Sequence, residues 1–156
     1  MFGNGMVLGA ALTNADTEAK YPLGTVYFDP KTGNAYRYVK AAAALTNDTI
    51  AAKESLSYAD NAFTVTNDIS AGLGVVAPAG VAISAIGERE YGWIQVSGKA
   101  VLIGDGSVAA GEAVVLDSSD GKVDTMAAGE EHEVFAFALE ADDTAGNVNC
   151  MLRGLL

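Results

Sequence analysis

The 156-residue chain has one cysteine, one histidine and three prolines, and its charges are strongly unbalanced. A single cysteine, Cys150, excludes a disulfide within the chain and a cysteine-rich zinc site. A single histidine, His132, excludes metal motifs that need two histidines. Nine Lys and Arg against 20 Asp and Glu give a net charge of −11, which opposes binding to phosphate backbones. We therefore expect no nucleic-acid partner.

Long hydrophobic runs of the kind that cross membranes are also missing. The uncharged residues 71–87, which lie within the longest uncharged stretch (69–87), are rich in Ala and Gly and carry Pro78 near their middle. A membrane-spanning helix would contain Leu, Ile and Phe throughout, so we expect two short buried strands around a turn. The N-terminus lacks the basic residues that open a secretory signal. The sequence therefore predicts no membrane partner.

Residues that could support catalysis are few and poorly grouped. His132 lies in an acidic run, where an exposed histidine is expected more often than a general base. Cys150 lies in an alternating apolar segment and is expected to be a small core residue. Acidic pairs occur at Asp142–Asp143 and at Glu88 with Glu90, by proximity alone. No glycine-rich phosphate loop is present. We expect a protein that is not an enzyme and that needs no cofactor.

One acidic loop resembles a calcium loop in part. Asp117, Asp120 and Asp124 place three carboxylates around Gly121. Calcium takes six to eight oxygen ligands, and the bidentate Glu that would complete such a loop is missing at the required position. The alternative is a hairpin turn whose Asp side chains bond to the backbone. We assign no metal site, and calcium binding by this loop stays open.

Among the abundant residues, glycine gives the most information about the secondary structure. The 18 glycines are scattered singly beside small and polar residues, which is typical of turns between short strands. Alternating or apolar runs predict strands at 26–28, 35–40, 63–66, 92–98, 99–103, 112–116, 132–139 and 148–153. The predicted fold is all-β, a small β-sandwich or barrel-like domain of short antiparallel strands with at most one short helix. That helix would lie within residues 41–54, capped at 46–48, unless this segment is a loop between edge strands.

Two turn features are specific enough to test. Pro30, Gly33 and Asn34 predict a hairpin between the first two strands, with Tyr36 and Tyr38 on one face of the second. The sequence of residues 109–112, Ala-Ala-Gly-Glu, recurs at 127–130. The spacing of 18 residues is short for a structural repeat, so we interpret the recurrence as shared turn chemistry.

The aromatic residues Tyr36, Tyr38 and Trp93 are candidates for an interface, together with Tyr91. Trp and Tyr are enriched among the residues that carry binding energy at interfaces. Core packing is the alternative, and for Trp93 it is at least equally expected. We divide the chain into an N-terminal arm or strand, residues 1–14, and a single β-rich domain, residues 15–156.

Four segments together carry a resemblance to a known family. They are residues 24–28 continuing through 36–39, residues 91–100 with a Gly-Trp-Ile-Gln strand, the Ala-Gly-Glu turn of 108–112, and residues 137–141 with 151–154. In these segments the chain resembles the capsid decoration proteins, or cement proteins, of tailed bacteriophages. Residues 1–14 and 41–57 do not share the resemblance.

The resemblance implies a structural role. Such proteins are β-rich, usually trimeric, and bound to the outside of the icosahedral head, which they brace against the pressure of packaged DNA. It implies the major capsid protein and further copies of this chain as partners, and the outer surface of the virion as location. Alternatives are another virion β-domain (a head-fibre base or a tail-associated domain) and a bacterial surface module that binds glycans or calcium. The candidates for capsid contact are the apolar residues of the arm: Met1, Phe2, Met6, Val7 and Leu8.

Overall fold

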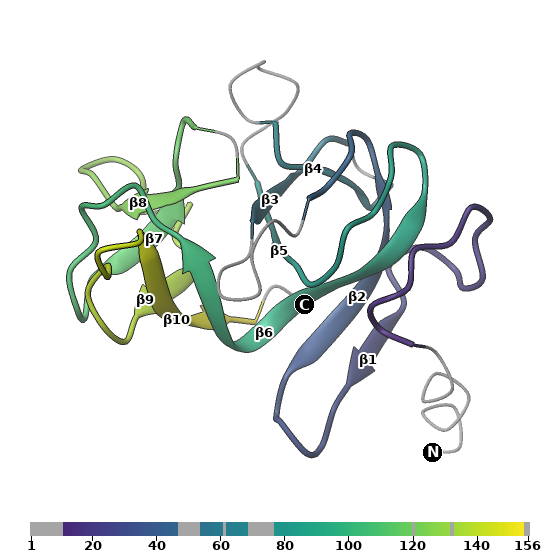
Figure 1. Ribbon diagram of the computed structural model, residues 1–156, viewed down its shortest axis with the longest axis horizontal. Coiled ribbons are helices and arrows are strands. Elements are labelled where there is room, and N and C mark those ends of the chain that lie inside the picture. Colours follow the sequence, from purple (N-terminus) through teal and green to yellow (C-terminus); the bar gives the residue numbers. More distant parts are fainter. Residues whose placement is uncertain are drawn as a thin grey trace.

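The computed structural model describes residues 11–46, 54–60, 62–68, 77–119, 121–131 and 133–154. Within these ranges the chain forms ten β-strands and no helix (Figure 1). The strands are β1 (Val26–Phe28), β2 (Ala35–Ala41), β3 (Ser55–Tyr58), β4 (Thr64–Thr66), β5 (Pro78–Ala82), β6 (Tyr91–Ile103), β7 (Ala113–Leu116), β8 (Val123–Thr125), β9 (Ala136–Ala138) and β10 (Asn147–Arg153).

Five strands close into a barrel, which we call the N-terminal barrel. Around the ring β2 pairs with β4, then β3, β5 and β6 follow, and β6 returns to β2. All of these pairs are antiparallel except β2–β4, which is parallel, with Lys40 opposite Thr64. Strand β1 pairs with the first half of β2, outside the ring. The hairpin predicted from Pro30 and Gly33 is therefore present.

The remaining strands form a second group, the C-terminal barrel, built on the second half of β6. This half pairs with β10, and the order continues through β9, β7 and β8. Gly104, directly after β6, forms a parallel bridge to Val123 of β8 and so completes a second ring. In Figure 1 the long strand β6 runs across the molecule between the two groups.

Strand β6 changes partners at a bulge. Its pairing with β2 shifts register, because Ala35 lies opposite Ser97 while Tyr36 lies opposite Gln95. The buried Gln95 side chain stabilises this point: its Nε2 donates to the carbonyls of Ser97 (3.1 Å) and Lys99 (2.8 Å). Gly98 has a φ of +96°, a value that favours glycine. The two runs predicted at 92–98 and 99–103 are thus one 13-residue strand, and its register shift lies at residues 95–97, directly before the glycine at which a bulge was expected.

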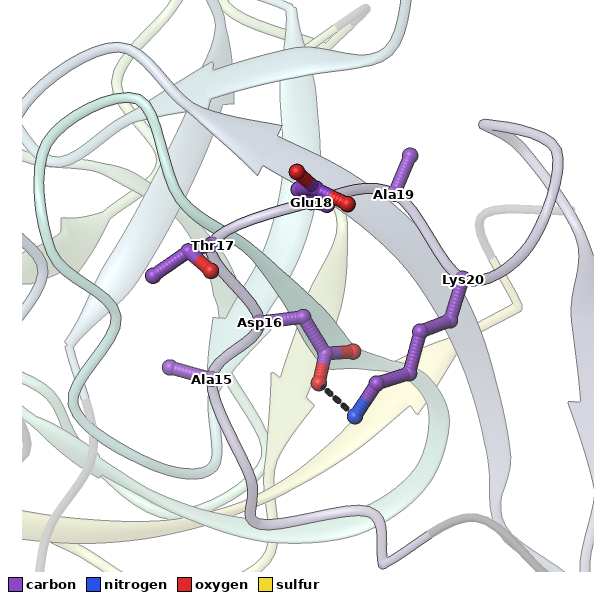
Figure 2. Close-up of a pocket in the computed structure, with 6 residues that line it drawn as sticks. All are labelled: Ala15, Asp16, Thr17, Glu18, Ala19 and Lys20. Atoms are coloured by element: carbon purple, nitrogen blue, oxygen red, sulfur yellow. Dashed lines mark ion pairs between the residues drawn. The ribbon is translucent and has the colours of Figure 1, made fainter.

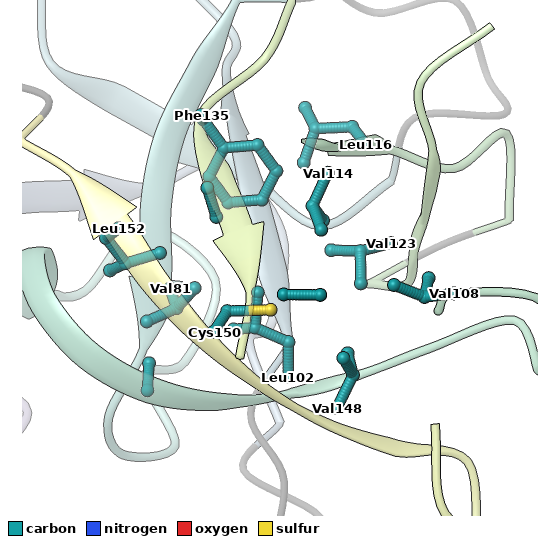
Figure 3. Packing of buried hydrophobic residues seen from close by; sticks show 13 residues of the cluster. Val81, Leu102, Val108, Val114, Leu116, Val123, Phe135, Val148, Cys150 and Leu152 are labelled. Atoms are coloured by element: carbon teal, nitrogen blue, oxygen red, sulfur yellow. The ribbon is translucent and has the colours of Figure 1, made fainter. Parts of the chain in front are cut away.

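Each barrel has its own hydrophobic core. The N-terminal core includes Val39, Leu56 and Ile94, and the C-terminal core includes Leu102 and Phe135 (Figure 3). Val81 belongs to the C-terminal core although its strand, β5, is part of the N-terminal barrel. The Ser55 hydroxyl of β3 donates to the Lys122 carbonyl at 2.7 Å, between the same two groups. The two barrels are therefore packed together along β3 and β5 as well as joined by β6.

The sequence predicted the fold class correctly, and several local expectations can be compared. Within residues 41–54, β2 extends to Ala41 and Leu45 forms a bridge to Ile86. Residues 47–53, where most of the alternative helix would lie, are outside the described residues. Two details of the predicted fold class differ from an arrangement of short antiparallel strands alone: β6 has 13 residues, and the pair β2–β4 is parallel. Of the buried strands expected in 71–87, β5 is present and residues 71–76 are not described.

The recurring Ala-Ala-Gly-Glu segments form the same turn twice. The Glu112 carboxylate accepts a hydrogen bond from the backbone N–H of Ala109, and Glu130 accepts one from Ala127, both at 2.8 Å. In each turn the glycine has positive φ, +85° at Gly111 and +100° at position 129. This confirms that the recurrence reflects turn chemistry.

Candidate functional site

The predicted aromatic interface residues lie in one cluster on the outside of the N-terminal barrel. Trp93 packs against Tyr38 and Tyr21, with ring centroids 5.2 and 5.4 Å away, and Tyr36 stacks on Tyr27. Tyr38 is 0% exposed and Trp93 is 1% exposed. Tyr38 and Trp93 are therefore core residues in this structure, and they present no surface to a partner. Tyr36 is half-buried, and its role at an interface stays a prediction.

Asp16 fastens the segment that covers this cluster. Its backbone exchanges two hydrogen bonds with Tyr91, both at 2.8 Å. Its carboxylate accepts a hydrogen bond from the Tyr38 hydroxyl (2.8 Å) and forms an ion pair with Lys20. The buried tyrosine hydroxyl and the buried carboxylate thus satisfy one another.

A depression of about 380 Å³ lies beside this ion pair and is lined by residues 15–20 (Figure 2). The lining comes from consecutive residues of one segment rather than from several elements. Its buried carboxylate, that of Asp16, is already engaged by Lys20 and Tyr38. The other carboxylate of the lining, that of Glu18, lies on the exposed surface of the same segment, so the lining does not bring a second element against the Asp16 carboxylate.

Burial of two titratable groups predicts that the fold weakens at alkaline pH. Burial raises the pKa of the Tyr38 hydroxyl from 10.0 to about 12, and that of the Cys150 thiol from 9.0 to about 12. In the unfolded chain both groups ionise near their ordinary values. Tyr38 and Cys150 in their neutral forms thus contribute fully to the free energy of unfolding below about pH 9. This contribution is lost as the pH rises toward 12, because ionisation then favours the unfolded chain.

We expect the free energy of unfolding, measured by urea titration, to fall steadily between pH 9 and 12. A Tyr38→Phe, Cys150→Ala double variant should show a shallower decline over the same range, because both groups that ionise on unfolding are gone. An equally steep decline in the double variant would contradict the assignment to these two groups.

The acidic residues considered for chemistry bond mainly to backbone groups of turns. Asp142 accepts hydrogen bonds from the N–H groups of Gly106 (2.9 Å) and Val108 (3.2 Å), and Asp143 accepts them within its own turn. Glu90 accepts the N–H of Gly87 at 2.9 Å, and Glu88 pairs with Arg89 on the surface. Cys150 is a buried core residue, as predicted. His132 lies outside the described residues.

The part of the chain considered for calcium contains a strand that the sequence did not predict. Asp124 lies in β8, and its Oδ1 accepts hydrogen bonds from Thr125 N–H and from the Ser107 hydroxyl (2.9 Å). Asp117 accepts a hydrogen bond from the Ser118 hydroxyl, and Asp120 lies outside the described residues. Among the residues that the structure describes, no group of three or more His, Cys, Asp or Glu is placed to hold a metal ion.

The predicted capsid contacts of the N-terminal arm lie outside the described residues, which begin at Ala11. These contacts are Met1, Phe2, Met6, Val7 and Leu8, and they stay predictions. Over the described ranges, the structure contains no helix with the length and apolar character to cross a membrane.

A feature that sequence reasoning missed is a set of exposed apolar side chains. The large hydrophobic residues that are exposed among those described are Val26, Phe28, Phe137, Leu139 and Met151, between 37% and 55% exposed. Met151 of β10 lies directly opposite Phe137 of β9. The alternation of residues 137–139 was visible in the sequence, but alternation alone does not say which side of a strand faces water.

Charges on the strands differ from those of the chain as a whole. Nine of the ten strands contain no Asp or Glu, and Asp124 of β8 is the exception. Lys99 of β6 and Arg153 of β10 are both exposed, and Lys99 lies opposite Met151. The exposed apolar side chains on β9 and β10 therefore have cationic neighbours in a strongly acidic protein.

The arrangement defines an all-β protein of two small barrels that share one long strand. No family model and no curated protein matches the chain. A solved structure does match it: the crystal structure of the head fiber gp8.5 N base of bacteriophage phi29, with a TM-score of 0.50 and 15% sequence identity. The match covers 78% of this chain and 96% of that chain. The two proteins are similar in fold.

Proposed function

We propose that this chain is a structural protein of a phage virion, carried on the outside of the head. The observation that supports this most is the fold similarity, because it extends over nearly the whole of a head-fibre base from a phage. The resemblance of residues 91–100 and 108–112 to capsid decoration proteins supports the same class independently. A protein held on an outer shell needs stable β-structure and contact surfaces rather than a catalytic centre.

Within this class we propose a decoration role, in which copies of the chain bind the major capsid protein and stabilise the head. A charge of −11 favours solubility at the high concentrations that decoration by many copies requires. We propose a homotrimer, because a trimer that contacts several capsid subunits gains affinity from simultaneous contacts. A head-fibre base is the second candidate, and the fold similarity to a phage head-fibre base favours it.

Mixing the protein with heads that lack it tests the proposal. We expect binding at a fixed stoichiometry to mature, expanded heads, and much weaker binding to unexpanded shells or free capsid subunits. The reason is geometric, since a multivalent ligand binds best where its sites stand at the final spacing. Cosedimentation measures the binding, and decorated heads should rupture at a higher temperature than bare heads because binding stabilises the intact state.

Two outcomes would count against parts of this proposal. Equal binding to expanded and unexpanded shells would contradict decoration of the mature head. Heads that bind the protein at only a few positions, without gaining thermal stability, would favour the head-fibre base over decoration. Light scattering of the free protein measures its oligomeric state separately, and a monomer at micromolar concentration would contradict a preformed trimer.

A further inference from the structure

Three of the five large hydrophobic side chains that are exposed among the described residues lie together on the C-terminal barrel. Met151 of β10 lies opposite Phe137 of β9, and residues directly opposite one another in a sheet point to the same side. Leu139 is two residues after Phe137, and its N–H bonds to the Asn149 carbonyl (2.7 Å), which places it beside the same part of β10. The three side chains are 37% to 46% exposed, so they form one apolar cluster that faces the solvent.

Charged side chains of both signs flank this cluster. Lys99 of β6 lies opposite Met151 on the side away from β9, and Arg153 is two residues after Met151 on β10. Both cations are exposed. On the other flank, the exposed Glu140 carboxylate accepts a hydrogen bond from the side-chain amide of Asn149 (2.8 Å). We call this set the β9–β10 surface, and its members are Phe137, Leu139, Met151, Lys99, Arg153 and Glu140.

The charges of the β9–β10 surface are not neutralised within the described part of the chain. Lys99, Arg153 and Glu140 form no ion pair with any residue in the described ranges. Single exposed hydrophobic residues are common on proteins, but a cluster with a charged rim is typical of a contact surface. The surface therefore offers an apolar centre, cations on one flank and a carboxylate on the other.

We propose that the β9–β10 surface is the contact between copies of this chain. Its apolar side chains are buried when copies meet, and the Lys99 side of one copy faces the Glu140 side of the next. In a ring, each copy presents two different sides to its two neighbours, so a surface with opposite charges on its flanks matches a copy of itself. The inference rests on the homotrimer of the proposed function, because it names the surface that the trimer uses.

The charges of the surface favour a copy of the chain over a partner of one sign. A strongly acidic or strongly basic partner would place like charges against either Glu140 or the two cations, which disfavours the contact. The net charge of −11 makes copies of the chain repel one another in general. The β9–β10 surface has two cations and one carboxylate, so this repulsion is absent where the copies touch. Charges elsewhere are screened beyond about 10 Å at 0.1 M salt.

The apolar centre is tested by light scattering of the free protein over a range of concentrations. Phe137→Ser should raise the concentration needed for self-association on the order of tenfold or more, because central apolar contacts carry most of the binding energy. Phe28→Ser is the matched control. Phe28 is 55% exposed but lies on β1, at the N-terminal barrel, so its replacement should leave self-association unchanged.

The flanking charges are tested by exchanging them. Lys99→Glu places two carboxylates against one another across the contact, and Glu140→Lys places two cations there. Each single change should therefore weaken self-association on the order of tenfold. The variant that carries both changes restores opposite charges and should self-associate nearly as well as the wild type. Lys122→Glu, at an exposed position in the turn between β7 and β8, changes the net charge equally and should have no such effect.

Four outcomes would overturn the inference while a trimeric wild type leaves the homotrimer standing. The first is unchanged self-association in Phe137→Ser, and the second is an equal loss in Phe28→Ser. The third is a combined charge variant that does not recover. The fourth is normal self-association with lost binding to heads, which would assign the surface to the shell protein. Circular dichroism and thermal melting check that each variant is folded.

The head-binding function is measured separately from the contact between copies. A wild type that stays monomeric at all concentrations tested would overturn both the homotrimer and the β9–β10 surface as its contact. Cosedimentation of the same protein with expanded heads then shows whether the virion role stands without self-association. A trimeric wild type that fails to bind heads would instead overturn decoration and leave the contact between copies in place.

Discussion

Replacing Trp93 with alanine is expected to lower the free energy of unfolding by about 3–5 kcal/mol. The indole is 1% exposed and lies among three tyrosine rings, with the centroid of Tyr38 at 5.2 Å and that of Tyr27 at 6.5 Å. Truncation removes these contacts and leaves a cavity that rigid strands cannot close. Urea titration followed by circular dichroism measures the loss.

An exposed aromatic residue provides the control for this change. Phe137→Ala removes a ring that is 45% exposed, and we expect it to change stability by no more than about 0.5 kcal/mol. Near-equal effects of the two substitutions would contradict the burial of Trp93. A stable Trp93→Ala protein that no longer self-associates would instead favour the interface role considered from the sequence.

The second large effect is expected at Gly80 in β5, where alanine should destabilise the fold by about 3 kcal/mol or more. Gly80 has a φ of +148°, which residues with a side chain rarely adopt. A Cβ atom there would lie 2.4 Å from the backbone carbonyl oxygen of Gln95. That oxygen belongs to β6, the strand shared by both barrels, so relieving the contact would displace the main chain.

Gly33 separates the two causes of this loss. It also has positive φ, +76°, but no atom lies within 4 Å of the position of its Cβ. Gly33→Ala therefore measures the backbone penalty alone, which we expect to be about 1–2 kcal/mol. Thermal melting of both variants compares them, and a Gly80→Ala protein as stable as Gly33→Ala would show that β5 and β6 are not packed this closely.

Local patterns allowed much of the strand content to be predicted. Pro30 and Gly33 mark the first hairpin, the alternation around Trp93 marks β6, and Gly98 lies directly after the bulge of that strand. These signals are local, because turn geometry and side-chain alternation depend on neighbours in the sequence. Strand β3 was missed because Ser55 and Ser57, which are both buried, do not resemble core residues.

Pairing between distant strands could not be predicted. The parallel pairing of β2 with β4 closes the N-terminal barrel and places Lys40 opposite Thr64. The sequence between these two strands has no clear pattern that would indicate this pairing. The exposure of Phe137 beside Met151 was missed for a related reason. These two residues lie opposite one another only through the pairing of β9 with β10, and no local pattern encodes that pairing.

The shared strand β6 also determines the order in which the two barrels can fold during synthesis of the chain. All five strands of the N-terminal barrel lie before residue 104, so this barrel can close while the C-terminal third is still being made. The C-terminal barrel has no such independence, because its first strand is the second half of β6. The finished N-terminal barrel then presents a fixed template on which β10 pairs last. A ribosome that is stalled when residue 104 has just left the exit tunnel should therefore carry one folded barrel. A separate fragment that starts at residue 104 should remain unfolded.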